Sequence, residues 1–250
     1  LWGLNRCNSG TDGDSPDERR GRTVVCRYCY DSYICPEVIQ GFFYMETKDR
    51  EYMNRARILA DRGRGWVNPN PLVGAVIVKD GRIIGEGWHE RYGGLHAERN
   101  AFKNCTEDTR GAALYVTLEP CCHYGKTPPC TDIVIEKGIA RVVVGLTDPN
   151  PLVAGKGIEK LRNAGIEVVV GIEQELLREQ NRIFLKYITT KQPWVALKTA
   201  MTLDGKIATV EGDSKWVTAE AARLRVHQMR SEYRGILAVS YTHLTLPTIA

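Results

Sequence analysis

The sequence lacks several features that would place it in other classes of protein. No apolar run among its 250 residues approaches the roughly 18 needed to span a bilayer. The first ten residues do not have the basic-then-apolar order of a secretory signal. The charge excess is only +4, from 34 basic and 30 acidic residues, and does not indicate a nucleic-acid partner. We therefore expect a soluble cytoplasmic protein that binds neither nucleic acid nor membrane.

Two further absences narrow the choice. No GxGxxG fingerprint is present, so a Rossmann dinucleotide site is not predicted. Eight cysteines would suit a small secreted disulfide scaffold, but they are spread over the whole chain and several cluster with histidine. That distribution favours thiolate metal ligands in a reducing compartment over disulfides. The composition, 43% hydrophobic and 26% charged, is typical of a globular protein with one large domain or two ordinary ones.

Residues 1–44 differ in pattern from the rest of the chain. Much of this segment is polar and without period, which is typical of loop or disorder. Cys26 and Cys29 form a CxxC pair, with Cys35 after it, but no second pair follows at zinc-ribbon spacing. Met45 stands directly before the first strongly patterned helix. We expect residues 1–44 to be a non-native or disordered leader, and hypothesise that Met45 is the natural start.

Helical and extended patterns alternate from residue 48 to about 187. Apolar residues first recur at helical spacing, and two apolar runs around Lys79-Asp80-Gly81 then predict a β-hairpin. The elements predicted after the hairpin are a helix from about His96, a strand at Ala113–Leu118, a helix near Thr131–Lys137, a strand at Arg141–Leu146, a helix at Gly157–Ala164, a strand at Glu167–Val170 and a long helix from about Gln174 to Tyr187. This alternation predicts βαβ units and a largely parallel sheet covered on both faces.

A second, shorter unit follows a predicted linker at Thr189–Pro193. Strand patterns are found at Trp194–Thr199 and Gly235–Val239. Between them, Thr218 can cap a helix that runs to about Arg230. With about 60 residues this unit is short for an α/β domain, so we expect it to be truncated.

Residue types that bind metals cluster in the first unit. The segment GGLHAERNAF places His96 and Glu98 two residues apart where a helix begins, and TLEPCCHYGKTPPC follows. A catalytic zinc takes three protein ligands and keeps one position for water. His96, Cys121 and Cys130 meet that need, and Glu98 can carry protons from the water to the ring nitrogen and the leaving ammonia. His-x-Glu followed by Pro-Cys is the signature of zinc nucleobase deaminases.

Spacing alone does not force the choice of ligands. Eight residues separate Cys121 from Cys130, whereas the deaminase signature has CxxC. Cys122 or His123 could therefore replace one of the two thiolates. Cys121 and Cys130 are favoured because one follows a predicted strand and the other starts a predicted helix, whose dipole stabilises a thiolate. A structural zinc site would take four protein ligands and would have no use for Glu98.

Four segments together resemble the bacterial bifunctional riboflavin-biosynthesis deaminase–reductases. They are HAE, TLEPCCHYGKTPPC, RVVVGLTDPNPLVAGKGIEKLRNAGIEV and ALKTAMTLDGKIATVEGDSKWVT. The resemblance implies a three-layer cytidine-deaminase-like α/β/α domain over residues 45–190, followed over 191–250 by the start of a dihydrofolate-reductase-like α/β domain. It also implies Zn²⁺-dependent hydrolysis of the 2-amino group of a 2,5-diamino-6-ribosylamino-4(3H)-pyrimidinone 5′-phosphate. Reduction of the ribosyl group to ribityl by NADPH is the implied next step.

The resemblance also assigns site residues. It identifies the zinc ligands as His96, Cys121 and Cys130, and the proton carrier as Glu98. It places deaminase substrate contacts at Asn70, His89, His123 and Lys126. It places reductase substrate contacts at Lys198, Ser214 and Arg230, and NADPH contacts at Ala200 and Trp216. Without the resemblance, Asn70 is equally typical of a turn before proline, and His89 of a polar strand end.

The sequence departs from the family pattern in two respects. Position 122 is Cys where the family usually has Ser, and this thiol could compete for the metal. The likeness also stops near residue 239, so we expect residues 239–250 to be foreign and the NADPH site to be non-functional. A cytidine or tRNA-adenosine deaminase is disfavoured by the GKTPP insertion and the LDGKIA segment, and a noncatalytic zinc module by Glu98. The oligomeric state, including a homo-oligomer, stays open.

Overall fold

The computed structural model describes residues 36–124, 128–150 and 154–237, with residues 36–46 described by their backbone alone. The chain divides into two compact units, Leu1–Phe43 and Tyr44–Ala250. The second unit contains the sheet and the predicted site. Among the described residues, no helix is both long and apolar enough to cross a bilayer.

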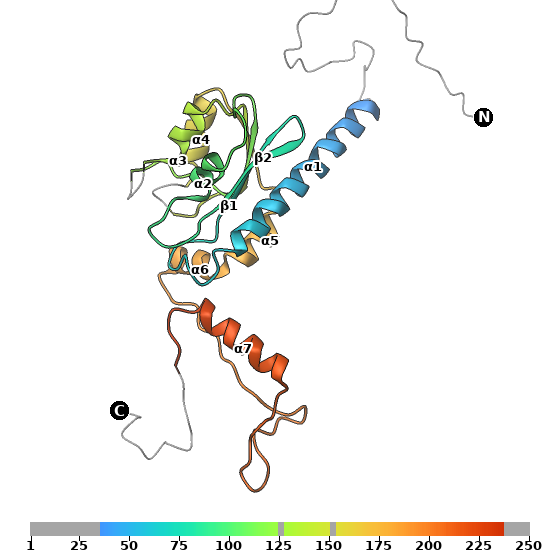
Figure 1. The fold of residues 1–250 in the computed structure, drawn as a ribbon, viewed down its shortest axis with the longest axis vertical. Coiled ribbons are helices and arrows are strands. Elements are labelled where there is room, and N and C mark those ends of the chain that lie inside the picture. The colour runs from blue at the N-terminus through green and yellow to red at the C-terminus, as the bar shows by residue number, and fades with distance from the viewer. Residues whose placement is uncertain (1–35, 125–127, 151–153, 238–250) are drawn as a thin grey trace, which may run out of the picture. The chain divides into compact units, whose positions relative to one another are not determined.

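Helices and strands alternate through most of the second unit (Figure 1). In chain order, the described elements are α1 (Pro36–Asp61), β1 (Gly74–Lys79), β2 (Arg82–Trp88), α2 (Ala97–Lys103), β3 (Ala113–Leu118), α3 (Cys130–Glu136), β4 (Arg141–Leu146), α4 (Lys156–Asn163), β5 (Glu167–Val170), α5 (Gln174–Gln180), α6 (Arg182–Thr190) and α7 (Glu220–Glu232). Strands β3, β4 and β5 have the predicted bounds, and the predicted hairpin is β1–β2.

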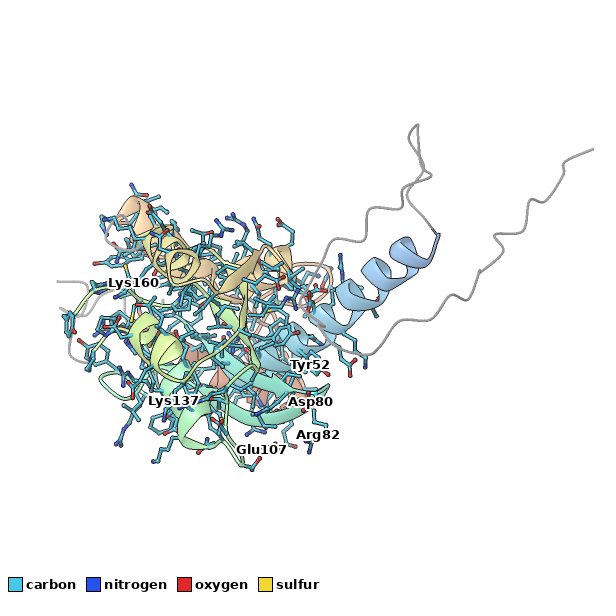
Figure 2. All side chains as sticks on the ribbon, turned by 90° about the horizontal axis from the view of Figure 1, so that it is seen from above. Tyr52, Asp80, Arg82, Glu107, Lys137 and Lys160 are labelled. Atoms are coloured by element: carbon cyan, nitrogen blue, oxygen red, sulfur yellow. The ribbon has the colours of Figure 1, made fainter. Side chains whose placement is uncertain are left out.

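The sheet has five strands in the order β2-β1-β3-β4-β5. Strands β3, β4 and β5 are parallel, whereas β1 is antiparallel to both β2 and β3. The prediction of a largely parallel sheet is therefore wrong for the half that contains the hairpin. A two-residue turn reverses the chain there, with Asp80 at φ 48° and Gly81 at φ 74°. Tyr52 of α1 donates a hydrogen bond to the Gly81 carbonyl oxygen at 2.8 Å, which fixes this turn. Figure 2 labels Tyr52 and Asp80, the other residue of the turn.

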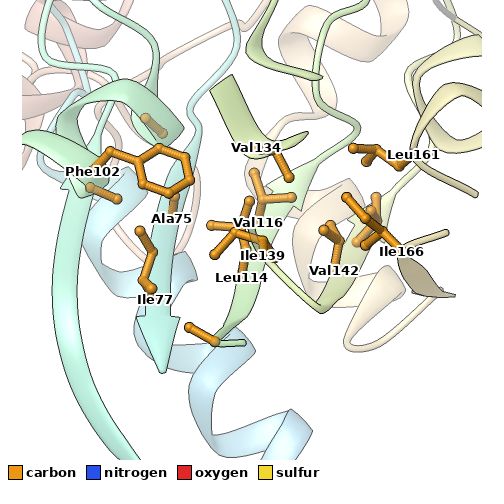
Figure 3. Packing of buried hydrophobic residues seen from close by; sticks show 14 of the residues in the cluster. Ala75, Ile77, Phe102, Leu114, Val116, Val134, Ile139, Val142, Leu161 and Ile166 are labelled. Atoms are coloured by element: carbon orange, nitrogen blue, oxygen red, sulfur yellow. The ribbon is translucent and has the colours of Figure 1, made fainter. Parts of the chain in front are cut away.

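Helices cover both faces of the sheet. Successive residues of a strand point to opposite sides, so each strand contributes side chains to both helix layers. One face packs Ala75, Ile77 and Val116 against α2, α3 and α4, as Figure 3 shows. The other face packs Val76 and Val143 against α1 and α5. The three-layer α/β/α arrangement agrees with the predicted fold class.

Helix α1 is fixed to the sheet by a buried ion pair. Both carboxylate oxygens of Asp49 accept hydrogen bonds from the Arg141 guanidinium, at 2.8 and 2.7 Å. The Tyr115 hydroxyl donates to the same carboxylate at 2.8 Å. The helix itself begins earlier than predicted, since its backbone is already helical from Pro36. The backbone of residues 36–44 is thus helical and not irregular, while the expectation of a non-native or disordered leader over residues 1–44 stays a prediction. Residues 1–35, with Cys26, Cys29 and Cys35, lie outside the described residues.

The long helix predicted from Gln174 to Tyr187 is two helices, α5 and α6, separated at Asn181. The Asn181 side chain accepts a hydrogen bond from the Leu72 backbone N–H at 2.8 Å and donates one to the Leu72 carbonyl oxygen at 2.9 Å. These tertiary bonds explain why a residue with low helix propensity interrupts an otherwise helical pattern. Helix α6 extends to Thr190, into the predicted linker Thr189–Pro193.

Residues 191–237 depart most from the prediction. Trp194–Thr199 is not a strand, and neither is the described part of Gly235–Val239. Helix α7 is present, but its N-cap is Ala219 and not Thr218. None of the residues 191–237 is buried. The physical reason is that a strand is stabilised by its neighbours, and no described strand pairs with this segment.

Candidate metal centre and active site

Three metal-ligand side chains converge where α2, β3 and α3 meet. His96 is the N-cap of α2, Cys121 follows the end of β3, and Cys130 is the first residue of α3. The His96 Nδ1 atom lies 3.5 Å from Cys121 Sγ and 3.4 Å from Cys130 Sγ. The three ligand atoms all lie within 4.8 Å of one another. The structure thus brings together the three residues that the sequence predicts as ligands.

The spacing and chemistry of this group fit zinc. A tetrahedral zinc with Zn–S bonds of about 2.3 Å and a Zn–N bond of about 2.0–2.1 Å holds nitrogen and sulfur about 3.6 Å apart. The two nitrogen–sulfur distances match that separation. Among the described residues this is the only His, Cys, Asp or Glu group arranged to hold a metal ion, and it contains neither Cys122 nor His123. Three ligands leave a tetrahedral ion one position for a small molecule.

Hydrogen bonds within the metal-ligand group shift the pKa values of its members in opposite directions. The Cys130 side chain, His96 and the Cys130 backbone N–H all hydrogen-bond Cys121, and they lower its pKa to about 4 although burial acts in the opposite direction. The bond to Cys121 and burial together raise the pKa of Cys130. The bond to Cys121 also raises the pKa of His96. A metal ion would replace the protons that these three groups share.

Glu98 lies two residues after His96, in the first turn of α2, and is buried, with 3% of its surface exposed. Burial raises the pKa of its carboxyl group, while the nearby His96 opposes the shift. A buried carboxyl beside a metal-ligand group is suited to accept and return a proton near neutral pH. The role of Glu98 as proton carrier stays a prediction.

Asn70 and His89 lie beside the metal-ligand group. Asn70 Nδ2 is 3.1 Å from His89 Nε2, and His89 Nδ1 is 2.9 Å from the Leu95 carbonyl oxygen. The network is satisfied when Nδ1 carries the proton and Nε2 accepts from Asn70. Burial lowers the pKa of His89, which favours this neutral form. The rings of His89 and His96 are 5.7 Å apart, edge to face.

The other predicted deaminase contacts are less well defined. His123 is exposed in the segment that follows Cys121. It lies near Asp148 at the end of β4, where burial raises the pKa of the Asp148 carboxyl and His123 opposes that shift. Lys126 lies outside the described residues.

The predicted reductase residues do not form a site in the described structure. Lys198, Ser214, Trp216 and Arg230 are exposed, and Ala200 is half-buried. The Trp216 ring is 70% exposed and packs under the guanidinium of Arg223, at 4.4 Å from its centroid. Without the strands predicted for this unit, nothing brings the five side chains together.

The sequence prediction missed Glu119, a buried carboxylate between β3 and Cys121. Its Oε1 accepts backbone N–H bonds from Gly157 at 2.9 Å and Ile158 at 3.2 Å. Its Oε2 accepts from Asp148 at 3.2 Å and Gly155 at 2.9 Å. Glu119 thus ties the strand end that carries Cys121 to the loop before α4. The signal was a carboxylate directly after a strand pattern whose residues are mostly apolar.

Comparison with known proteins agrees with this geometry. Residues 46–146 match the cytidine and deoxycytidylate deaminase zinc-binding region, and residues 193–245 match the RibD C-terminal domain. The second match ends at residue 245 and so includes part of the segment 239–250, which the sequence pattern led us to expect to be foreign.

Curated relatives share long stretches of sequence with the chain. It is 59% identical over 189 residues to the riboflavin biosynthesis protein RibD of Actinobacillus pleuropneumoniae, a match that covers 76% of this chain and 50% of that protein. It is 48% identical over 197 residues to RibD of Escherichia coli, covering 79% and 54% respectively. The chain therefore spans about half the length of the curated relatives that it matches.

Solved structures agree in fold. A Thermotoga maritima diaminohydroxyphosphoribosylaminopyrimidine deaminase/5-amino-6-(5-phosphoribosylamino)uracil reductase is 55% identical, with a TM-score of 0.72, over 76% of this chain and 54% of that one. Acinetobacter baumannii RibD is 49% identical, with a TM-score of 0.71, over 75% and 52%. The predicted cytidine-deaminase-like fold and zinc-binding deaminase region are confirmed. The chain is similar to the bacterial riboflavin-biosynthesis deaminase–reductases, and it carries a zinc-binding deaminase region followed by a C-terminal region that matches their RibD C-terminal domain.

Proposed function

We propose that this chain deaminates 2,5-diamino-6-ribosylamino-4(3H)-pyrimidinone 5′-phosphate by zinc-dependent hydrolysis in the cytoplasm. The observation that carries the proposal is the group of His96, Cys121 and Cys130 beside the buried carboxyl of Glu98. A structural zinc site needs four protein ligands and has no use for a buried acid. This group has three ligands and one buried acid, Glu98.

His96, Cys121 and Cys130 would hold the zinc, which supplies Lewis-acid activation of water when bound. Glu98 accepts the proton that the attacking water loses, and then returns protons to the ring nitrogen and the departing amino group. Its burial keeps bulk water away from these transfers and holds the carboxyl in one place. Water adds its oxygen to the ring carbon, and ammonia leaves.

Asn70 and His89 are suited to orient the pyrimidine. The neutral His89 ring uses both nitrogens to hold Leu95 and the Asn70 amide, and would contact the pyrimidine through its ring face. The Asn70 amide has a second N–H and an oxygen with which to donate to and accept from the pyrimidine edge. Lys126 would meet the phosphate as a point charge, with His123 nearby in sequence. These substrate contacts and the domain division at about residue 190 are parts of the proposal. The partner is a small molecule and no nucleic acid.

The test is a liquid-chromatography assay of the purified chain with the diaminopyrimidinone phosphate. Conversion is expected in the zinc-loaded protein, with loss of activity after chelation and recovery when zinc is restored. Cytidine and deoxycytidylate serve as competitors, because the matched family region takes its description from enzymes of those two substrates. Zinc-loaded protein that leaves the diaminopyrimidinone unchanged but converts either competitor would contradict the proposed substrate.

A further inference from the structure

The metal-ligand group is assembled from two pieces of the chain, and each piece is internally connected. Cys121 and Cys130 are joined by backbone hydrogen bonds, because the Cys130 N–H donates to Cys121 Sγ at 3.3 Å and the Thr131 N–H donates to the Cys121 carbonyl oxygen at 3.2 Å. His96 and Glu98 belong to the other piece, the start of α2. Among the described residues, no backbone hydrogen bond joins α2 to Cys121 or to α3.

Arg99 provides a polar connection between the two pieces. It follows Glu98 in α2, and its Nη2 donates to the carbonyl oxygen of Pro128 at 3.0 Å and to that of Pro129 at 3.3 Å. Pro129 is the N-cap of α3, immediately before Cys130. Proline fixes φ, so the two prolines carry Cys130 as one stiff unit. Holding their carbonyl groups therefore holds the Cys130 sulfur relative to His96.

The Arg99 side chain is half-buried between the two pieces. Its Nε is buried without a hydrogen-bond partner among the described residues, so the guanidinium is held here through the Nη2 bonds to the two proline carbonyl groups.

We infer that Arg99 is a positioning residue of the metal centre, which fixes the separation of His96 and Cys130 through the Pro128 and Pro129 carbonyl groups. The inference rests on the proposed function only in taking His96, Cys121 and Cys130 as the zinc ligands. Arginine suits the task because one planar guanidinium nitrogen can donate to two neighbouring carbonyl groups.

The test compares Arg99→Met and Arg99→Lys with Lys103→Met in the full chain. Met keeps the apolar stem without donors or charge, whereas Lys keeps the charge but not the planar fork. Lys103 is an exposed cation on the same helix and is the matched control. The readouts are the rate of zinc release to a chromophoric chelator and the visible absorption spectrum of the Co²⁺-substituted protein, which reports ligand geometry.

Arg99→Met is expected to release zinc at least ~10-fold faster and to shift the Co²⁺ bands, as loss of a hydrogen bond behind the ligands does in other metal sites. Arg99→Lys is expected to recover less than half of the zinc retention that Arg99→Met loses. Lys103→Met is expected to release zinc, and to absorb as the Co²⁺ form, like the unmodified chain. Release rates and spectra equal to those of the unmodified chain in both Arg99 variants would overturn the inference. If Arg99→Met does not fold, the Lys variant decides by the same criteria.

The outcomes separate this inference from the proposed function. A chain that holds zinc and depends on Arg99 to do so, but does not deaminate, contradicts the function and supports the positioning role. A chain that deaminates with Arg99-independent zinc release contradicts only the positioning role. A chain that binds no zinc contradicts both.

Discussion

The backbone N–H of Cys130 donates to Sγ of Cys121 at 3.3 Å, so the start of α3 stabilises a thiolate carried by the end of β3. Eight residues separate the two cysteines in sequence, yet both sulfur atoms lie within 3.5 Å of His96 Nδ1. Cys122, the direct neighbour of Cys121, has no place in the group that results.

Zinc content should therefore distinguish the neighbouring cysteines. The purified chain is expected to bind about one zinc ion, as a single three-ligand site requires. Cys121→Ser and Cys130→Ser should each lose most of it, because a hydroxyl is a poor substitute for a thiolate, whereas Cys122→Ser should keep it. Elemental analysis by mass spectrometry measures the content. Loss of zinc in Cys122→Ser, with retention in Cys121→Ser, would refute the ligand assignment.

Glu98→Gln should separate metal binding from proton transfer. The amide has the size of the carboxyl but cannot accept a proton, so deamination should fall by at least ~10²-fold while zinc content stays unchanged. Turnover of the diaminopyrimidinone phosphate by zinc-loaded protein is the measurement. A zinc-loaded variant with near-normal turnover would show that another group moves the protons.

Asp49→Asn should destabilise the fold without touching the metal centre. The Asp49 carboxylate is 7% exposed and pairs with Nη1 and Nη2 of the half-buried Arg141. Its loss removes the buried partner of that cation and leaves the exposed Glu167 carboxylate, which lies 3.1 Å from Arg141 Nε. The free energy of unfolding is expected to fall by about 3 kcal/mol in urea titrations. Glu51→Gln is the control on the same helix, since Glu51 is 61% exposed and pairs with the surface residue Lys48. Its effect should stay within about 0.5 kcal/mol, and equal effects of the two substitutions would disprove the anchor.

Deletion of residues 1–44 should leave zinc content, melting temperature and deamination unchanged. The anchor of α1 to the sheet lies at Asp49, inside the retained part. The deletion removes one part of α1, and the contacts of Tyr52 and Met53 with the sheet persist. A large drop in melting temperature would show that the segment with Cys26, Cys29 and Cys35 is a structural element.

The segment from about residue 191 should be less protected than the deaminase region and should not support reduction. None of its described residues is buried, and the five predicted reductase contacts are not assembled. Hydrogen exchange should therefore be faster across residues 191–237 than across β1, β3 and β4. NADPH absorbance should stay constant when deaminated substrate is added. Steady substrate-dependent NADPH oxidation, or equal protection of both segments, would show a competent reductase.

The sequence by itself determined the deaminase region in considerable detail. The strands Ala113–Leu118, Arg141–Leu146 and Glu167–Val170 were predicted with their bounds, because their apolar runs are short, continuous and flanked by helical patterns. His96, Glu98, Cys121 and Cys130 were identifiable because metal chemistry restricts residue type and because the motif is local. The hairpin turn at Asp80 and Gly81 was identifiable since few residues adopt left-handed backbone angles.

Only the tertiary structure decided the features that depend on partners distant in sequence. The break between α5 and α6 comes from the bonds of Asn181 to Leu72, and the role of Glu119 comes from four N–H groups at least 29 residues away. The sequence already favoured Cys121 and Cys130 over Cys122, and the approach of α3 to β3 brings these two thiols to within 3.5 Å of His96 Nδ1. Trp194–Thr199 has a strand pattern but no strand beside it, and a strand pattern becomes a strand only where a neighbour satisfies its backbone hydrogen bonds.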